Sequence, residues 1–495
     1  MTSDRIRHSR ETHVVGLTVL VLVIGSLIGV LVGAPPSPLI TILAVAGLAV
    51  FLLILYRPDV GVVALVFMVY LNLSDVATEF HNAPSLVQIY VPALLAIVLI
   101  RRTLFGDRVG SAKQVVIALG AYGLFMSVSL LHASLPDIVS SALVIFLKNA
   151  ALVCVLVLLI TRGATLRAVV WALLVAGTLL SALACYRYFG GPFATDFGGL
   201  ARATVNIDEG QITEFRITGP VSDSNVFAQI MIIIVPLAID RLFHEKSLGL
   251  RCAAATALVL STLAISLTFS RGGFVALVLM LLVMLVHRRP PLRHLLLLAV
   301  VVVGTFFVMP KEYTERIYTI GAMLPGRGAT VESADLAVQG RLAEMSVAWQ
   351  MFLDHPFVGV GVGHYEVYFQ QYSMRMALMP RGQARKAHSL YLEIAAERGL
   401  LGLLMFAALV AVVVHNVRFS IKQLREAGLE QYVTMVQAIS YALIGYFSAA
   451  VFLHMAYPRY LWLLVGMAFV LPNVVRGELA PNDNQRGDFA LDGRA

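Results

Sequence analysis

Apolar residues run in long blocks along the chain, and short polar segments separate them. Most blocks hold about 15 to 20 apolar residues, enough for a helix to cross a bilayer core of about 30 Å. Within a bilayer such segments satisfy their backbone groups only as helices. The pattern therefore predicts an all-α polytopic membrane protein with about 12–14 transmembrane helices. The candidate spans are residues 14–33, 38–55, 59–73, 86–100, 114–132, 140–160, 165–186, 224–243, 251–269, 272–287, 293–309, 399–417, 432–453 and 459–474.

Composition supports this class, because 59% of the residues are hydrophobic and only 13% are charged. A net charge of +8 would suggest nucleic acid in a soluble protein, but here the basic residues follow the membrane pattern, so no nucleic-acid partner is predicted. The three cysteines lie in apolar blocks without CxxC spacing or nearby histidines, which indicates neither a disulfide framework nor a metal site.

Lys and Arg concentrate in alternate connections between the blocks, and the opposing short connections 33–37, 74–85 and 133–139 hold none. Because these residues favour the cytoplasm, both termini are predicted to be cytoplasmic. The predicted organisation is transmembrane helices over 1–309, an outer (periplasmic) loop over 310–398, further transmembrane helices over 399–475, and a disordered cytoplasmic tail over 476–495. The loops at 187–223 and 310–398 and the turn at 270–273 then lie on the same outer side.

The first candidate site ends the loop at 187–223. Arg216 precedes a segment, 222–224, whose residues suit a helix N-cap, and Asn225 follows in the first turn. An arginine beside the positive end of a helix dipole could bind the phosphate of a substrate. The alternative is an arginine at the membrane interface beside an ordinary cap.

The second candidate is the turn Ser270–Arg271–Gly272–Gly273, where two apolar blocks meet almost without a loop. Arg271 could be a second anion ligand, with the glycines letting substrate approach the backbone. The alternative is a tight helical hairpin with an arginine that extends to the membrane surface.

The third candidate is the end of the long loop, where His388 could act as a base near neutral pH. The alternative for His388 is a capping histidine or a histidine at the membrane interface. The alternative for Glu393 and Glu397 is a solvated helix face. Residues 359–363 read Gly-Val-Gly-Val-Gly without a surrounding βαβ unit, so they predict a turn between amphipathic helices rather than a nucleotide site, and no cofactor is predicted. Upstream, Leu342, Met345, Trp349 and Phe352 form one stripe, expected to lie on the membrane or on the bundle.

Lys148 stands in the middle of an apolar block beside Asn149. A cation in that position usually faces the interior of a bundle, where it serves either function or a structural partner.

Taken in order, these motifs resemble the O-antigen ligase and polymerase superfamily over roughly residues 200–415. They are Arg216-x-x-Gly219 with Asn225 and Ala228, Ser270–Arg271–Gly272, Gly340–Arg341, His355–Pro356–Phe357-x-Gly359-x-Gly361, His388–Ser389-x-x-Leu392 and Glu397-x-Gly399-x-x-Gly402.

The resemblance implies a GT-C-like glycosyltransferase of the bacterial inner membrane. It would take a glycan from undecaprenyl diphosphate at the periplasmic face. A ligase would transfer this glycan to a lipid A-core sugar, and a polymerase would transfer it to a growing glycan. The enzyme would be in contact with membrane lipid. The resemblance further implies that Arg216 and Arg271 bind the diphosphate, that His388 assists the acceptor hydroxyl, and that Arg341 supports the site. Asn225, Glu397 and Lys148 are further supporting candidates, and the expected mechanism is metal-independent and inverting.

Two other classes stay open. A polysaccharide or lipid-linked oligosaccharide transporter would spread polar residues through its spans and show internal repeats, neither of which is evident. A structural scaffold or sensor would give the outer arginines no task and would tolerate Arg271→Lys, which bidentate diphosphate binding would not.

Overall fold

The computed structural model describes residues 51–104, 110–191, 193–208, 211–288, 336–378 and 385–480. Within them the chain is mainly helical, with one two-stranded antiparallel sheet. The elements are α3 (Pro58–Tyr70), α4 (Leu73–His81), α5 (Leu86–Leu104), α6 (Lys113–Ser127), the 3₁₀ helix η1 (Val128–Leu131), α7 (Pro136–Leu159), α8 (Gly163–Phe189), β1 (Arg202–Asp208), β2 (Gln211–Gly219), α9 (Ser224–His244), α10 (Leu248–Leu267), α11 (Arg271–Arg288), α14 (Leu336–Asp354), α15 (Tyr365–Arg375), α16 (Leu390–Glu426), α17 (Glu430–Ala449) and α18 (Pro458–Leu479).

Nine of the described helical segments are long and apolar enough to cross a membrane, and the pair α3 and α4, bent by 56°, makes a tenth candidate. The predicted class, an all-α polytopic membrane protein, is thereby confirmed. The candidate spans 14–33 and 293–309, most of 38–55 and the tail from 481 lie outside the described residues. The predicted domain boundaries stay predictions.

One predicted span, 432–453, corresponds to a helix that is less apolar than the nine. This helix, α17, carries Gln437, Ser440 and Tyr441 in its middle. It packs against α9, α11 and α16, so that much of its surface contacts protein. A helix surrounded by other helices can hold more polar residues than one that faces lipid.

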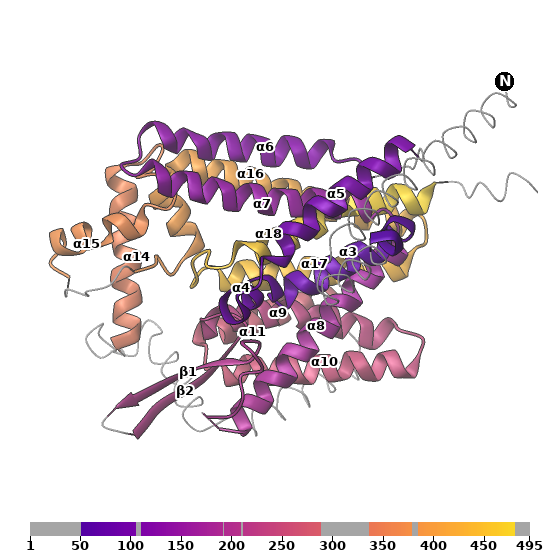
Figure 1. Ribbon diagram of the computed structural model, residues 1–495, viewed down its shortest axis with the longest axis horizontal. Helices are drawn as coiled ribbons and strands as arrows, with labels where there is room; N and C mark the ends of the chain where they lie inside the picture. The colour runs from indigo at the N-terminus through magenta and orange to yellow at the C-terminus, as the bar shows by residue number, and fades with distance from the viewer. Residues whose placement is uncertain are drawn as a thin grey trace, which may run out of the picture.

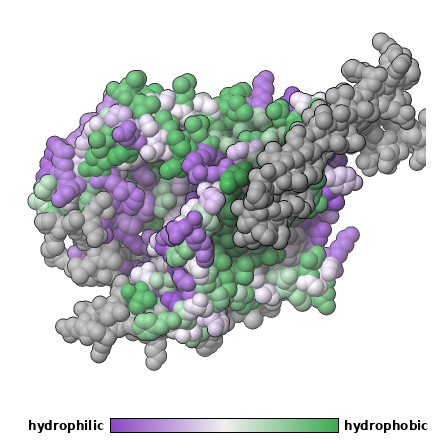
Figure 2. Space-filling model, in the orientation of Figure 1, coloured by the Kyte–Doolittle hydropathy of each residue, from purple (hydrophilic) through white to green (hydrophobic). Residues whose placement is uncertain are grey.

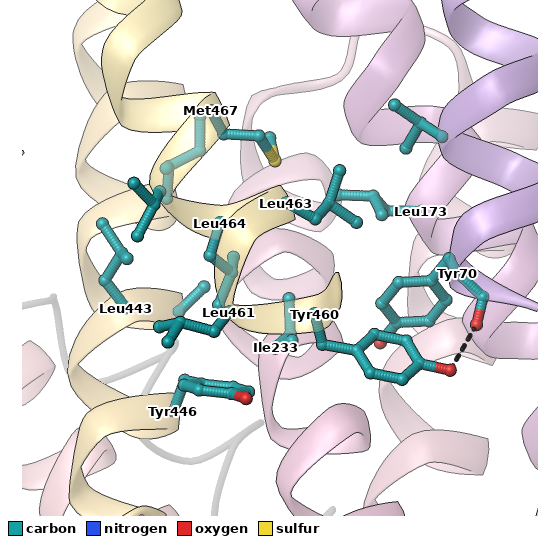
Figure 3. Close-up of a cluster of buried hydrophobic side chains, with 14 of the residues drawn as sticks. Tyr70, Leu173, Ile233, Leu443, Tyr446, Tyr460, Leu461, Leu463, Leu464 and Met467 are labelled. Atoms are coloured by element: carbon teal, nitrogen blue, oxygen red, sulfur yellow. Dashed lines mark hydrogen bonds between the residues drawn. The ribbon is translucent and has the colours of Figure 1, made fainter. Parts of the chain in front are cut away.

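The centre of the bundle is formed by α9 and α18. Their most apolar stretches are 94% and 89% buried inside the protein. Figure 3 shows side chains from several helices meeting there, with Leu461 and Leu464 of α18 beside Leu443 of α17. The hydroxyl of Tyr460 donates to the carbonyl of Tyr70 at 3.2 Å. Because these helices are apolar on every side, the sequence pattern shows no single buried stripe for them.

Basic residues gather at one end of the bundle, as the charge pattern predicted. At the end of α9, Arg241 binds Asp240 at 2.6 Å and Glu245 at 3.1 Å. Arg167, from the start of α8, pairs with the same Glu245. In Figure 1 the α9–α10 connection at this end lies to the right, whereas β1, β2, α14 and α15 lie to the left. The hairpin and the helices α14 and α15 thus lie at the opposite end of the protein from these basic residues.

The β-hairpin was not foreseen, since residues 187–223 were expected to form a loop. β1 and β2 pair antiparallel, with Val205 opposite Phe215 and Thr204 opposite Arg216. A search for apolar blocks overlooks strands that alternate polar and apolar residues. The hairpin matters because it fixes Arg216 in a defined register.

The glycine-rich segment 359–363 packs against a break in α16. At Gly399 (φ 63°) the helix is interrupted, which frees the carbonyls of residues 396 and 397 and the N–H groups of residues 400 and 401. The N–H groups of Val360 and Gly361 donate to the first pair at 2.9 and 3.0 Å, and the carbonyls of Pro356 and Phe357 accept from the second pair at 2.7 and 3.2 Å.

Glycine is required on both sides of this contact. A Cβ at Gly359 would lie 2.2 Å from the carbonyl carbon of Glu397, and one at Gly399 would lie 2.4 Å from that of Phe357. Both residues also have positive φ, which glycine adopts at the least cost. The motif glycines therefore hold the segment 356–361 onto α16 through backbone contacts.

The stripe predicted on α14 is not the face that packs on the protein. The buried side chains of the helix are Glu344, Val347, Ala348 and Met351. Leu342 and Trp349, members of the predicted stripe, are 44% and 50% exposed. The other two, Met345 and Phe352, are partly buried, so the predicted stripe does not form the packed face of α14, and its contact with the membrane stays a prediction. Figure 1 shows α14 running across the direction of α6, α7 and α16.

Candidate functional site

Arg216 lies on β2 and reaches toward the turn between α10 and α11. Its Nε donates to the carbonyl of Thr268 at 2.7 Å, and its Nη2 lies 3.5 Å from Oδ1 of Asn225. The strand ends at Gly219, whose φ of 58° turns the chain and whose missing side chain makes room for the ring of Phe227. The Arg-x-x-Gly spacing thus aims the arginine at the neighbouring turn.

The start of α9 is capped as the sequence predicted. Oδ1 of Asp223 accepts from the N–H groups of Asn225 and Val226 at 2.6 and 3.2 Å. The side chain of Asn225 is buried, and its Oδ1 also accepts from the hydroxyl of Ser270 at 2.8 Å. Asn225 therefore joins Arg216 to the α10–α11 turn.

Arg271 is the first residue of α11 and is half-buried. A Cβ at Gly273 would lie 2.7 Å from Cβ of Ala228, and one at Gly272 would lie 3.1 Å from Cβ of Phe452. The tight helical hairpin expected here is present, and small residues let it pack on α9 and on the segment 450–457. This packing brings Arg271 and Arg216 to the same turn.

His388 precedes α16 and adopts a left-handed backbone conformation with φ 46°. Ser389 caps the helix by accepting from the N–H of Leu392, and the N–H of Leu390 donates to the carbonyl of Ala450 at 3.0 Å. A non-glycine residue with positive φ costs energy, so neighbouring contacts must hold it there. The capping role proposed as the alternative for His388 belongs instead to Ser389.

The imidazole of His388 is largely buried, with 19% of its side chain exposed. Burial, with a further contribution from Arg341, lowers the pKa of His388 to about 4. The ring is therefore neutral near pH 7 and can accept a proton. Its Nε2 lies 3.5 Å from the Glu344 carboxylate, and its buried Nδ1 has no hydrogen-bond partner among the described residues.

A second histidine, His454, packs against His388. His454 was not predicted from the sequence. The two rings form an edge-to-face pair with centroids 5.4 Å apart. Burial lowers the pKa of His454 to about 3, and its Nδ1 is also buried without a partner in the described part of the chain. The negative charge of Asp223 opposes the lowering of the pKa at both histidines. The N-cap of α9 therefore lies near them.

α14 supplies further charged groups near His388. Glu344 is only 3% exposed and lies between His388 and Arg385, whose Nε is 3.9 Å from its carboxylate. Arg341, one turn earlier, is half-buried and acts electrostatically on His388. Arg341 was predicted from the sequence but Glu344 was not, because Glu344 lies outside the local motifs.

Glu393 and Glu397 do not form a solvated face, and that expectation is corrected. An oxygen of Glu393 accepts from the N–H of Met455 at 2.8 Å. Glu397 is 4% exposed and accepts from the N–H of Tyr365 at 3.3 Å, at the start of α15. Arg398 beside it is buried and donates to the hydroxyl of Tyr122 at 3.0 Å. In this structure Glu397 connects α16 to the start of α15.

Lys148 does not join this group. It was expected to face the interior of the bundle, but its side chain is exposed on α7 and lines a groove between α5 and α7. The residues of α7 around Lys148 are apolar on every side of the helix, so the sequence could not show which way the Lys148 side chain points.

The other predicted residues are connected through a short series of contacts. Arg216 and Ser270 meet at Asn225, the α10–α11 turn packs on the segment that carries His454, and His454 touches His388. Within the described ranges, no group of three or more His, Cys, Asp or Glu side chains could hold a metal ion. The arrangement offers two arginines for an anion and a neutral imidazole for a proton.

Fold and site together define a polytopic α-helical membrane protein with a polar site at one end of the bundle, where hydrophilic residues gather (Figure 2). Residues 256–407 match the family model Wzy_C, described as O-antigen ligase, which confirms the resemblance to the O-antigen ligase superfamily. This supports an O-antigen ligase-like, glycosyltransferase type of enzyme. No curated protein matches the chain. The matched region includes Arg271, Arg341 and His388 and begins after Arg216 and Asn225.

Proposed function

We propose that the protein transfers a glycan from a polyprenyl diphosphate, such as undecaprenyl diphosphate, to a sugar hydroxyl at the periplasmic face of the bacterial inner membrane. The observation that carries this proposal is the series of contacts that joins Arg216 to the α10–α11 turn through Asn225, and that turn to His388 through the segment that holds His454. The family match supports the reaction class, and the ligase named in its description makes a lipid A-core sugar the first candidate acceptor.

In the proposed reaction, Arg216 and Arg271 bind the donor diphosphate and offset its charge. The acceptor hydroxyl loses its proton to His388 as its oxygen attacks C1 of the donor sugar. The bond between C1 and the diphosphate oxygen breaks, and polyprenyl diphosphate leaves with the bonding electrons. Attack opposite the leaving group inverts the anomeric carbon. Two arginines hold the leaving group in this scheme, which is therefore metal-independent.

The Glu344 carboxylate lies near Nε2 of His388, which favours Nδ1 as the nitrogen that accepts the proton. With a hydrogen on Nε2 facing Glu344, the lone pair lies on Nδ1, which has no other partner among the described residues. Glu344 would then orient the ring and stabilise the imidazolium that forms, as the carboxylate does in other acid–base pairs. Release of this proton to solvent or to product restores the neutral ring.

The test is complementation of a strain that lacks the protein, with surface glycans analysed on a gel. Wild type should restore them, and Arg216→Ala, Arg271→Ala and His388→Ala should not. Arg375→Ala is the matched control, because this arginine lies at the same end of the protein but is exposed and pairs with Asp354. Normal glycan in all three site variants would overturn the assignment.

The same gel separates the ligase from the polymerase. Loss of all glycan on lipid A-core, with full-length chains retained on the carrier lipid, identifies a ligase. Loss of long chains, with single-repeat products retained, identifies a polymerase of O-antigen or exopolysaccharide.

A further inference from the structure

A groove of about 440 Å³ lies beside α7 and shares no residue with the site around His388. Its walls are α5 and α7, and α4 and the start of α18 complete it. The polar residues that line it include Asp75, Gln88, Lys148, Asn149 and Arg459. The rest of its lining is largely apolar, so the groove combines a hydrophobic surface with a few polar groups.

Lys148 is the distinctive residue of this groove. It lies near the middle of α7, about 18 Å from either end at a rise of 1.5 Å per residue. Its neighbours Val144 and Leu147 are 49% and 62% exposed, as expected for a surface that faces lipid. A cation at this depth is costly unless an anion or water offsets its charge.

The described protein supplies no anion for Lys148. Asp75 is the one carboxylate that lines the groove, and it pairs with Arg459 at 2.7 Å. Arg459 also donates to Asn72 at 2.7 Å, which fixes its guanidinium. The described residues give Lys148 neither a hydrogen bond nor an ion pair. The lining therefore carries one net positive charge.

Two backbone features add polar groups to the groove, and the first of them favours an anion. α18 begins at Pro458 without a side-chain cap, so the positive end of its dipole lies at the groove. Pro92 inside α5 lacks an N–H, which leaves the carbonyl of Gln88 without its helical partner and able to accept a hydrogen bond from a headgroup hydroxyl or water.

We propose that this groove binds the phosphate group of a membrane lipid, with Lys148 as its main ligand. The apolar chain of the lipid would lie along the exposed residues of α5 and α7, among them Ile89, which is 61% exposed. Phosphate is the anion that a bilayer offers in combination with an apolar chain, which matches the polar and apolar parts of the groove. This site is separate from the proposed donor diphosphate site and does not depend on the transfer reaction.

The experiment measures lipid binding to the purified full chain in detergent by native mass spectrometry. The probes are phosphatidylglycerol and undecaprenyl phosphate, each compared with its phosphate-free counterpart, diacylglycerol and undecaprenol. Wild type should bind at least one phosphate lipid about tenfold more tightly than its counterpart, because a charged hydrogen bond contributes about 1.5–3 kcal/mol.

Substitutions assign the effect to the groove. Lys148→Gln should remove most of the preference for phosphate, and Lys148→Arg should retain it. Lys422→Gln is the control, since this lysine is 73% exposed near the end of α16 and does not line the groove. Equal binding of both phosphate lipids would indicate a general headgroup site, and binding of undecaprenyl phosphate alone would indicate the carrier lipid.

Either pattern supports the proposal. The proposal is overturned if wild type binds phosphate lipids no better than their phosphate-free counterparts, or if Lys148→Gln binds phosphate lipids as tightly as wild type does. Because no turnover is measured, an inactive protein that binds lipid normally would refute the transfer reaction and leave this site intact.

Discussion

The protonation of His388 gives the sharpest test of the site's electrostatics. The fall of its pKa from 6.5 to about 4 disfavours the imidazolium by about 3 kcal/mol. If neutral His388 is the base, the acid limb of kcat/KM should lie well below pH 6.5. Arg341→Gln should move that limb upward, and Asp223→Asn should move it downward, since these two charges act on the ring in opposite directions.

The expected displacement is about one pKa unit for each variant, because a unit charge near a partly buried group contributes about 1–2 kcal/mol. Asn is also a good N-cap, so Asp223→Asn should leave α9 intact. The assay is the initial rate of transfer at low substrate concentration, measured from about pH 4 to 8. Ionisation of the substrate diphosphate is common to all variants and cancels in their comparison.

An acid limb near pH 6.5 in wild type that neither variant moves would refute the role of neutral His388 as the base. That result would mean that the ring is solvated or that it does not transfer the proton. Displacement of the limb in the same direction by both variants would also contradict the account, because their charges are opposite.

Two further predictions concern the loop and the donor arginine. Gly399→Ala should destabilise the protein by about 1–3 kcal/mol or more, because its φ of 63° is strained for alanine and its Cβ would lie 2.4 Å from backbone. Gly120→Ala, with no atom within 4 Å, should be neutral or slightly stabilising, and thermal unfolding in detergent compares the two. Arg271→Lys should lower kcat/KM for the lipid-linked donor about tenfold or more, since lysine cannot bind phosphate in bidentate fashion. Arg375→Lys should leave the rate unchanged, and equal rates for the two variants would show that Arg271 has no such role.

The helices of the bundle could be predicted because their apolar blocks are long and the polar connections between them are short. The order of the motifs also identified Arg216, Arg271, Arg341 and His388, and in the structure Arg216 contacts the turn before Arg271, while Arg341 acts electrostatically on His388. Their direct contact with substrate stays a prediction.

The partners of these residues could not be predicted, because they come from segments far apart in the chain. Glu344 approaches His388 from α14, and His454 reaches the same ring from the α17–α18 connection. Neither lies in a local motif. The burial of Glu397 depends likewise on the loop that folds over it, and the hairpin holding Arg216 lacks the apolar block that marks a span.

The most direct test of the central claim is transfer by the purified protein in liposomes. A labelled polyprenyl-diphosphate glycan and its acceptor are supplied on one side, with a metal chelator present. The account predicts one polyprenyl diphosphate released for each glycan transferred, an inverted anomeric linkage, and no transfer by Arg216→Ala, Arg271→Ala or His388→Ala. Passage of intact lipid-linked glycan across the bilayer without release of polyprenyl diphosphate would contradict it and identify a transporter.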